Sequence, residues 1–267
     1  MNRIYYAFPG GKSKCLTMSY DDGKIQDKRL IEIFDKFGIK GTFNLNSGLF
    51  EADDSFVKPD EICDVYKNHE VATHTFTHPT LERCPLSEVA FEILEDRKKL
   101  EEILKKPVRG NAYPNGSYTQ EIEELFKKLG ISYARVVGAV PDFDMPKNRY
   151  EWHPTAHHNS PELMQLAEFF SDFKKKQYLK LMYVWGHSYE FDRDNNWKVI
   201  EEFCNYMGGH DDIWYATNIE IIDYMDAAKR LVFSADNSFV YNPNVMDICL
   251  DVNGEYINVK GGTTVFF

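Results

Sequence analysis

The sequence has few features of a disulfide-linked protein or of a membrane protein. Its five cysteines are scattered and odd in number, and no two form a Cys-x-x-Cys pair. This pattern favours free, mostly buried thiols over a disulfide framework or a zinc knuckle. No stretch approaches the roughly 20 apolar residues that a membrane-spanning helix needs, and residues 1–14 contain no apolar core of a signal peptide. We therefore expect no membrane insertion and a cytoplasmic location, or an extracytoplasmic one if a leader has been removed.

Basic charge is also scarce. The 31 Lys and Arg residues face 42 Asp and Glu residues, which gives a net charge of −11 at pH 7. Because phosphate contacts need clustered Lys and Arg, this balance argues against a nucleic-acid partner and an anionic membrane surface. Hydrophobic residues make up 43% of the chain and aromatic residues 15%. The chain can therefore bury a sizeable core, and its aromatic residues fit either that core or a groove for sugar rings.

Short apolar runs alternate with amphipathic stretches along most of the chain. We expect strands over residues 15–19, 41–45, 70–73, 108–112, 132–137, 178–185 and 213–216. We expect helices over residues 27–37, 59–67, 86–104, 119–129, 161–175, 197–207 and 218–231. This alternation implies about seven parallel strands joined by right-handed crossovers. A complete or distorted (β/α) barrel fits best, with its active site on the loops that follow the strands.

The pattern changes near residue 232. Short alternating runs follow at 239–241, 246–251, 256–259 and 263–267, and Asn253-Gly254 between two of them is a hairpin signal. We therefore expect residues 1–231 to form the barrel and residues 232–267 to form a small antiparallel β appendage on or beside it.

Two adjacent carboxylates, Asp21 and Asp22, follow the first expected strand and precede Gly23. Adjacent residues at a strand end point in different directions, so one can bind a metal while the other faces the substrate. Asp-Asp-Gly is also ordinary turn chemistry, and by itself the motif favours a turn.

His74 and His78 lie four residues apart, just after the expected strand 70–73. Neutral imidazoles are good ligands for zinc and similar ions, and Asp22 would complete a facial set of three. Three protein ligands leave positions open for water and substrate. A lone His-x-x-x-His is more often coincidence, but its combination with Asp-Asp-Gly favours a metal site.

Two further motifs follow expected strands. The turn from Tyr113 through Asn115 contains Pro and Gly, which fix a tight backbone that can aim an N–H at the substrate, although an ordinary turn also explains it. His187 comes directly after the expected strand 178–185. Its position suits a general acid as well as a histidine of the core or of a helix cap.

The order Asp-Asp-Gly, His-x-x-x-His, Tyr-Pro-x-Gly and strand-plus-His resembles the polysaccharide deacetylases, carbohydrate esterase family four, over about residues 14–231. The resemblance implies a distorted (β/α) barrel and a divalent metal, most often zinc, with cobalt, nickel or manganese as alternatives. It implies hydrolysis of acetyl groups from N-acetylglucosamine polymers, peptidoglycan or acetylated xylan.

The resemblance also implies roles for individual residues. Asp21 corresponds to the catalytic base and His187 to the acid that protonates the leaving group. Asp22, His74 and His78 correspond to the metal ligands. On the substrate side, the backbone N–H near Asn115 resembles the family's oxyanion donor, with Tyr113 in the same motif.

The sequence departs from the family at two places. Ala112 stands where the family commonly has an Arg that pairs with the catalytic base. Arg109 and Arg135 are the candidates to replace it, and we favour Arg135 because an inward position on the adjacent strand can reach the same place. The family's Asp-then-Trp motif is irregular here. We expect Trp152 to line the substrate groove and Asp142 to orient His187 through its second ring nitrogen.

A second His-x-x-x-His occurs at His153 and His157, next to His158. Pro154 makes a helical pair of ligands unfavourable, and no carboxylate pair precedes it. We interpret the segment as a substrate loop, and we expect residues 188–192 to shape the same mouth.

The favoured function is therefore metal-dependent removal of acetyl groups from an N-acetylated or O-acetylated carbohydrate. One alternative keeps the fold and changes the substrate to a small cyclic amide, ureide or formamide. The other is a non-catalytic carbohydrate-binding protein. The sequence indicates neither the particular sugar nor the oligomeric state.

Overall fold

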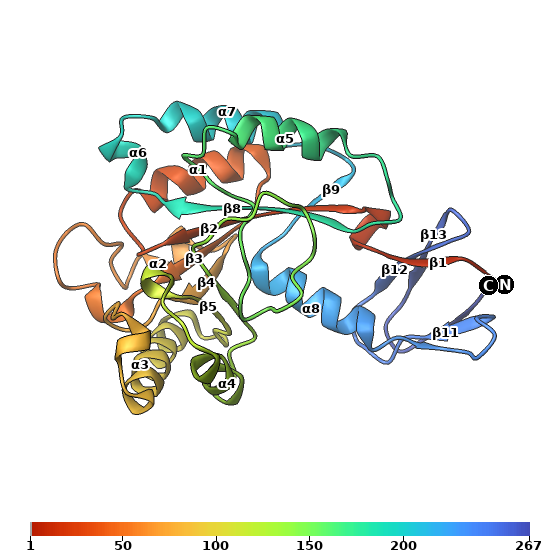
Figure 1. The fold of residues 1–267 in the computed structure, drawn as a ribbon, viewed down its shortest axis with the longest axis horizontal. Coiled ribbons are helices and arrows are strands. Elements are labelled where there is room, and N and C mark those ends of the chain that lie inside the picture. Colours follow the sequence, from red (N-terminus) through yellow and green to blue (C-terminus); the bar gives the residue numbers. More distant parts are fainter. Residues whose placement is uncertain (1) are drawn as a thin grey trace.

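The computed structural model describes residues 2–267, and its centre is a curled parallel sheet (Figure 1). The strand order is β6-β5-β4-β3-β2-β8-β7, and β9 adds to the sheet by pairing with β2. The strands are β2 (Lys14–Asp21), β3 (Gly41–Leu45), β4 (Glu70–Thr73), β5 (Gly110–Ala112), β6 (Tyr133–Arg135), β7 (Ala156–His157), β8 (Lys180–His187) and β9 (Ile213–Tyr215). The predicted distorted (β/α) barrel is confirmed, in the form of a half-barrel of parallel strands.

Helices cover this sheet on its outside. They are α1 (Asp27–Phe37), α2 (Ile62–Val65), α3 (Leu86–Leu104), α4 (Gln120–Lys128), α5 (Leu163–Asp172), α6 (Glu190–Arg193), α7 (Trp197–Met207) and α8 (Asn218–Lys229). Figure 1 shows α1, α5 and α7 grouped over one face, and α3 packs against α4 and β4. Short 3-10 turns are η1 (Pro9–Gly11), η2 (Ser47–Leu49), η3 (Leu81–Arg83) and η4 (Pro114–Gly116).

Strand β2 lies at the centre of the sheet and all eight of its residues are buried. Along it, apolar Leu16, Met18 and Tyr20 alternate with polar residues, so one face of the strand packs in the apolar core and the other face is polar although it is also buried. Helix α1 buries one apolar stripe against it and ends at Gly38, whose φ of 67° lets its N–H reach Asp35 O and Phe34 O. The carboxyl end of β2 therefore projects Asp21 at the rim shared by the other parallel strands.

The C-terminal strands form two small antiparallel sheets beside α8 (Figure 1). One joins β1 (Ile4–Ala7), β12 (Ile248–Val252) and β13 (Glu255–Val259), and the other joins β10 (Val232–Phe233), β11 (Phe239–Tyr241) and β14 (Thr264–Phe266). The predicted hairpin at Asn253-Gly254 is present, with positive φ at both residues. The N-terminal strand β1, assigned to the barrel from sequence, pairs with β12. The division after residue 231 otherwise stays a prediction.

The structure also shows the state of the cysteines and the character of the helices. All five cysteines are free, with Cys15, Cys204 and Cys249 buried and Cys63 exposed. Within residues 2–267, no helix combines the length and the apolar character needed to cross a membrane.

Candidate active site

The centre of the site is the Asp21-Asp22-Gly23 turn at the end of β2. Asp22 has a φ of 78° and Gly23 a φ of 65°, so two successive residues adopt the left-handed conformation. The Asp22 N–H donates to Asn44 O over 2.9 Å, which fixes the turn against β3. The left-handed conformation is uncommon for a non-glycine residue and occurs often at functional sites. It separates the two carboxylates, so that Asp21 is buried while Asp22 reaches the rim.

Asp22, His74 and His78 bring three potential metal-ligand atoms together, all within 4.8 Å of one another. The Asp22 Oδ1 atom lies 3.7 Å from His74 Nε2 and 3.8 Å from His78 Nε2. Two bonds of about 2.1 Å to one ion span such separations. His74 Nδ1 lies 2.8 Å from the carbonyl oxygen of Ala112, which can only accept a hydrogen bond. The proton of the neutral ring is therefore on Nδ1, and the lone pair on Nε2 is free for a metal.

Buried polar groups hold the backbone that carries these histidines. Asp96 of α3 accepts hydrogen bonds from Ser47 N (2.7 Å) and His74 N (3.2 Å). The Asn46 amide donates to Thr75 O over 2.9 Å and also to His74 O. Burial raises the pKa of Asp96 well above its usual value. Neither Asp96 nor Asn46 belongs to a local motif, so the sequence alone gives no signal for their role.

Arg135, from β6, forms a buried ion pair with Asp21 Oδ2. Its guanidinium carbon lies 4.5 Å from the centre of the Trp185 ring. Burial alone raises the pKa of Asp21, but the charges of Arg135, His74 and His187 outweigh it and hold the pKa of Asp21 at about 2. The structure thus puts Arg135 where the sequence analysis expected a replacement for the missing arginine. The other candidate, Arg109, lies elsewhere.

His187 ends β8, directly beside Asp21 in the parallel register of β2 and β8. Its Nε2 atom lies 3.9 Å from Asp21 Oδ2, and its Nδ1 atom lies 3.5 Å from Glu190 Oε2. Burial lowers the pKa of His187, but the interaction with Glu190 and the charges of Asp21 and Asp22 outweigh it, so the pKa of His187 is raised. The imidazole can therefore hold a second proton near neutral pH.

The sequence and the fold resemble those of known proteins. Residues 9–134 match the model of the polysaccharide deacetylase family. This part of the chain, just under half of its length, resembles that family. A chitooligosaccharide deacetylase from Rhizobium leguminosarum bv. phaseoli is 32% identical over 114 residues, which cover 42% of this chain and 48% of the relative. The chain thus spans about half of that relative's length, and a third of the length of a second one from Bradyrhizobium.

Solved structures of several descriptions share the fold. A Mycobacterium smegmatis protein provisionally described as a polysaccharide deacetylase has a TM-score of 0.62 at 14% identity, over 86% of this chain and 96% of that one. An allantoinase has a TM-score of 0.60 at 13% identity, over 81% and 91%. A pseudoenzyme of carbohydrate esterase family 4 from Bacillus anthracis has a TM-score of 0.51 at 20% identity, over 82% and 68%. At these identities the likeness establishes the fold alone.

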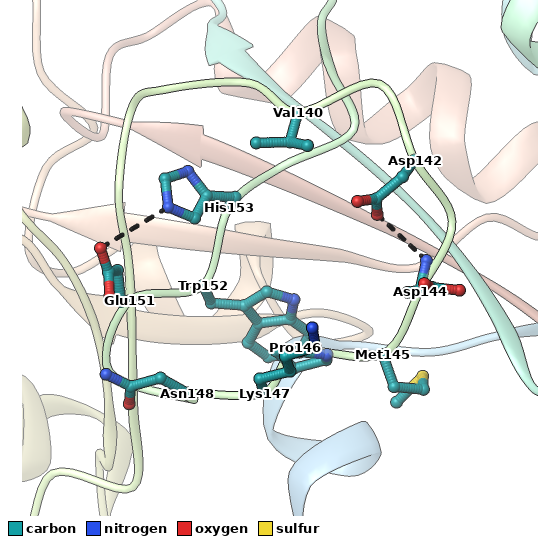
Figure 2. A pocket seen from close by; sticks show the side chains of 10 residues that line it. All are labelled: Val140, Asp142, Asp144, Met145, Pro146, Lys147, Asn148, Glu151, Trp152 and His153. Carbon is teal, nitrogen blue, oxygen red and sulfur yellow. Dashed lines mark hydrogen bonds and ion pairs between the residues drawn. The ribbon is translucent and has the colours of Figure 1, made fainter.

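The structure does not bring Asp142 to His187 as a partner. Asp142 lies in the loop between β6 and β7, where its carboxylate accepts a hydrogen bond from Asp144 N over 3.1 Å. Figure 2 shows it on the wall of a hollow of about 310 Å³ that this loop encloses. The carboxylate next to His187 is instead that of Glu190, three residues further along the chain. The first turn of α6 places it there, whereas the sequence predicted only that residues 188–192 shape the mouth.

The remaining family positions divide into buried side chains and an exposed turn. Trp152 is 1% exposed and packs edge-on against Tyr133 and Tyr183, so it belongs to the core behind the hollow and not to an open groove. Tyr113 is fully buried, and its hydroxyl donates to Tyr150 O over 3.0 Å. Asn115 lies in the exposed turn η4 with a φ of 56°. The Tyr113 side chain is therefore closed to a substrate, whereas the turn at Asn115 is accessible.

Proposed function

We propose that this chain is a metal-dependent hydrolase that removes acetyl groups from an N-acetylated or O-acetylated carbohydrate. The observation that carries the proposal is the arrangement of Asp22, His74 and His78 as one ligand set, with Asp21 and His187 beside it. All five side chains come from the carboxyl ends of β2 and β8 or from the loop after β4. The family match and the description of the Rhizobium relative support a carbohydrate substrate.

The chemistry of the three ligands fits zinc. Two imidazoles and one carboxylate form a typical catalytic zinc set that leaves positions open, and they also accept cobalt, nickel or manganese. The hydrogen bond from His74 Nδ1 to Ala112 O supports this fit, because it leaves Nε2 unprotonated. A divalent ion bound there supplies Lewis acidity, which polarises an acetyl carbonyl and lowers the pKa of an attacking water.

The protein side chains handle the protons. Asp21 is ionised at neutral pH because Arg135 holds its pKa low, so its carboxylate can accept a proton from the attacking water. His187 lies next to Asp21 and donates its Nε2 proton to the departing amine or alkoxide. The backbone N–H groups of the turn at Asn115 are the candidate donors to the developing oxyanion.

Acetate release from a panel of acetylated glycans tests the proposal. The panel contains chito-oligosaccharides, peptidoglycan fragments and acetylated xylan, each assayed with added zinc. We expect release by the wild type and a loss of about 10²- to 10⁴-fold in Asp21→Asn, the range for a general base. His210→Ala, which changes an exposed histidine bonded to Tyr206 O, is the control and should keep full activity. If the protein hydrolyses a cyclic ureide and releases acetate from none of the glycans, the deacetylase proposal is wrong and the alternative substrate class is favoured.

A further inference from the structure

A second cluster of titratable groups lies on the other side of His187, centred on Glu190. One oxygen of this buried carboxylate, Oε2, lies 3.1 Å from His157 Nε2, 3.3 Å from His158 Nε2 and 3.5 Å from His187 Nδ1. The His187 backbone N–H also donates to the same oxygen over 3.2 Å. The cluster joins β7, β8 and α6, all of which lie outside the residues that match the family model.

Two functions are compatible with this spacing. His157, His187 and Glu190 have three ligand atoms within 4.8 Å of one another, as a metal site would require. The same contacts also suit a hydrogen-bonded chain in which imidazole N–H groups donate to a carboxylate. The protonation of each ring decides between them, because a ring nitrogen that binds a metal must present a lone pair.

The backbone determines the tautomer of His157. The Asn159 N–H donates to His157 Nδ1 over 3.1 Å, so this nitrogen carries a lone pair. In the neutral ring the proton is therefore on Nε2, which faces Glu190. His74 has the reverse arrangement, because its Nδ1 faces a carbonyl oxygen and its Nε2 is free. The first cluster is thus arranged for a metal ion, whereas in the second the Nε2–H of His157 faces the Glu190 carboxylate.

His187 receives its orientation from the same carboxylate. Its Nδ1 lies 3.5 Å from the ionised Glu190 Oε2, and this negative charge favours a proton on Nδ1. The rings of Trp185 and Tyr189 flank the imidazole, with centroids 5.7 Å and 5.2 Å away. Nε2 consequently points to the opposite side, toward Asp21.

We propose that Glu190, held in place by His157, is the positioning residue of His187: it keeps a proton on Nδ1, so that Nε2 faces the reacting centre, and its charge favours the second proton that Nε2 must carry to act as an acid. This inference rests on the proposed function, in which His187 is the acid. Arg193 also holds the Glu190 carboxylate in position, because its guanidinium lies 3.4 Å from the other oxygen, Oε1. Burial raises the pKa of Glu190, but the hydrogen bonds and charges of His157 and His187 outweigh it and lower the pKa well below the usual range, so the carboxylate stays ionised.

Several charged or titratable groups act on His187, and only one contacts Nδ1. Burial opposes its second proton, whereas the carboxylates favour it. The groups that face it from the surrounding elements are Asp21 and Asp22 at the end of β2, Glu190 of α6, Tyr189 before α6, and His158 after β7. Removing the Glu190 charge should therefore leave the two aspartates in place and lower the pKa of His187.

The test compares the pH dependence of kcat for the zinc-loaded wild type, Glu190→Gln, Glu190→Asp and Glu70→Gln. Glu70 is the matched control, because it is an equally buried carboxylate that accepts hydrogen bonds from Thr42, Tyr133 and Ile219 away from His187. We expect the alkaline limb to move down by about one pH unit in Glu190→Gln, the scale of a nearby charge. Glu190→Asp should restore part of the shift, and Glu70→Gln should show none. An equal loss of kcat at every pH, with the alkaline limb unmoved, would make Glu190 merely structural and overturn the proposal.

A second measurement separates this inference from the proposed function. Nitrogen-15 NMR of the zinc-loaded protein reports the tautomer and pKa of His187 without any substrate. We expect an Nδ1–H tautomer in the wild type and a lower pKa of His187 in Glu190→Gln. If no glycan is deacetylated but this difference appears, the proposed function fails and the positioning by Glu190 stands. If acetate is released but the pKa of His187 is unchanged, or if a second zinc ion binds and is lost in Glu190→Gln, the positioning proposal fails.

Discussion

The buried ion pair between Arg135 and Asp21 allows a quantitative test of how the site is built. Arg135→Met keeps an apolar stem beside Trp185 but leaves the 2% exposed Asp21 without its cation. Removing one partner of a buried pair costs about 3–5 kcal/mol, because an uncompensated charge stays buried. We expect the free energy of unfolding of the metal-free protein to fall by this amount at pH 7. Urea denaturation followed by circular dichroism, with a chelator present, measures it.

Arg109→Met is the matched control. Arg109 pairs with Asp223, but the two side chains are 37% and 38% exposed. A pair in contact with water contributes about 0–1 kcal/mol, so this variant should lose little stability.

The cost of Arg135→Met should also depend on pH. Burial raises the pKa of Asp21, but Arg135 and its neighbours lower it from 3.8 to about 2. The wild type therefore has a stabilising contribution that is complete above about pH 4 and is lost as the pH falls toward 2, worth about 2 kcal/mol. Without Arg135, burial raises the pKa, and ionisation of Asp21 destabilises the fold instead. The difference between wild type and variant must grow from pH 3 to pH 7. A cost equal to that of Arg109→Met, or one independent of pH, would refute this reasoning.

Two further predictions concern buried carboxylates. Asp96→Asn leaves one acceptor oxygen for the two N–H groups of Ser47 and His74. We therefore expect the variant to bind zinc about 10- to 100-fold more weakly, as measured by competition with a chelator. An unchanged zinc affinity would contradict the role of Asp96. Burial raises the pKa of Glu70 from 4.5 to about 7, so wild-type stability should fall as the pH rises through this window. Glu70→Gln cannot titrate, so its free energy of unfolding should rise relative to that of the wild type by up to about 3 kcal/mol between pH 5 and pH 8, measured by urea unfolding. A difference in stability that does not change with pH would contradict the raised pKa of Glu70.

Local pattern was sufficient for elements whose sequence carries both a period and an end signal. The expected bounds of α1 match the structure, because its apolar stripe ends at Gly38 with a left-handed backbone. The expected helix 59–67 forms only at Ile62–Val65. Tyr66 leaves the helical conformation there, and its hydroxyl donates to the buried Asp27 over 2.7 Å. Strand β1 was missed because it pairs with a segment more than 200 residues away, a contact that no local window contains.

The residues of the candidate site also differ in whether a local motif predicts them. Asp21, Asp22, His74 and His78 stand in two short motifs, and the parallel sheet brings those motifs together at one rim. The expectation that Arg135 reaches Asp21 needed only the alternation of inward and outward side chains along a neighbouring strand.

The carboxylate that contacts His187 could not be predicted from local motifs or strand alternation. Asp142 was the expected partner because it lies in the region of the family's Asp-then-Trp motif, whereas the structure supplies Glu190 from α6. Its role depends on how β7 and α6 meet, and on a backbone N–H that sets the tautomer of His157.

The central claim is that a metal ion held by Asp22, His74 and His78 is required to hydrolyse acetylated glycans. Zinc content and acetate release from chito-oligosaccharides, measured on the same samples of wild type, His78→Ala and His210→Ala, test it most directly. The account predicts a single tightly bound zinc ion and turnover in the wild type and in His210→Ala, and neither in His78→Ala. Acetate release at the wild-type rate by His78→Ala, or by wild type stripped of metal in the presence of a chelator, would contradict it.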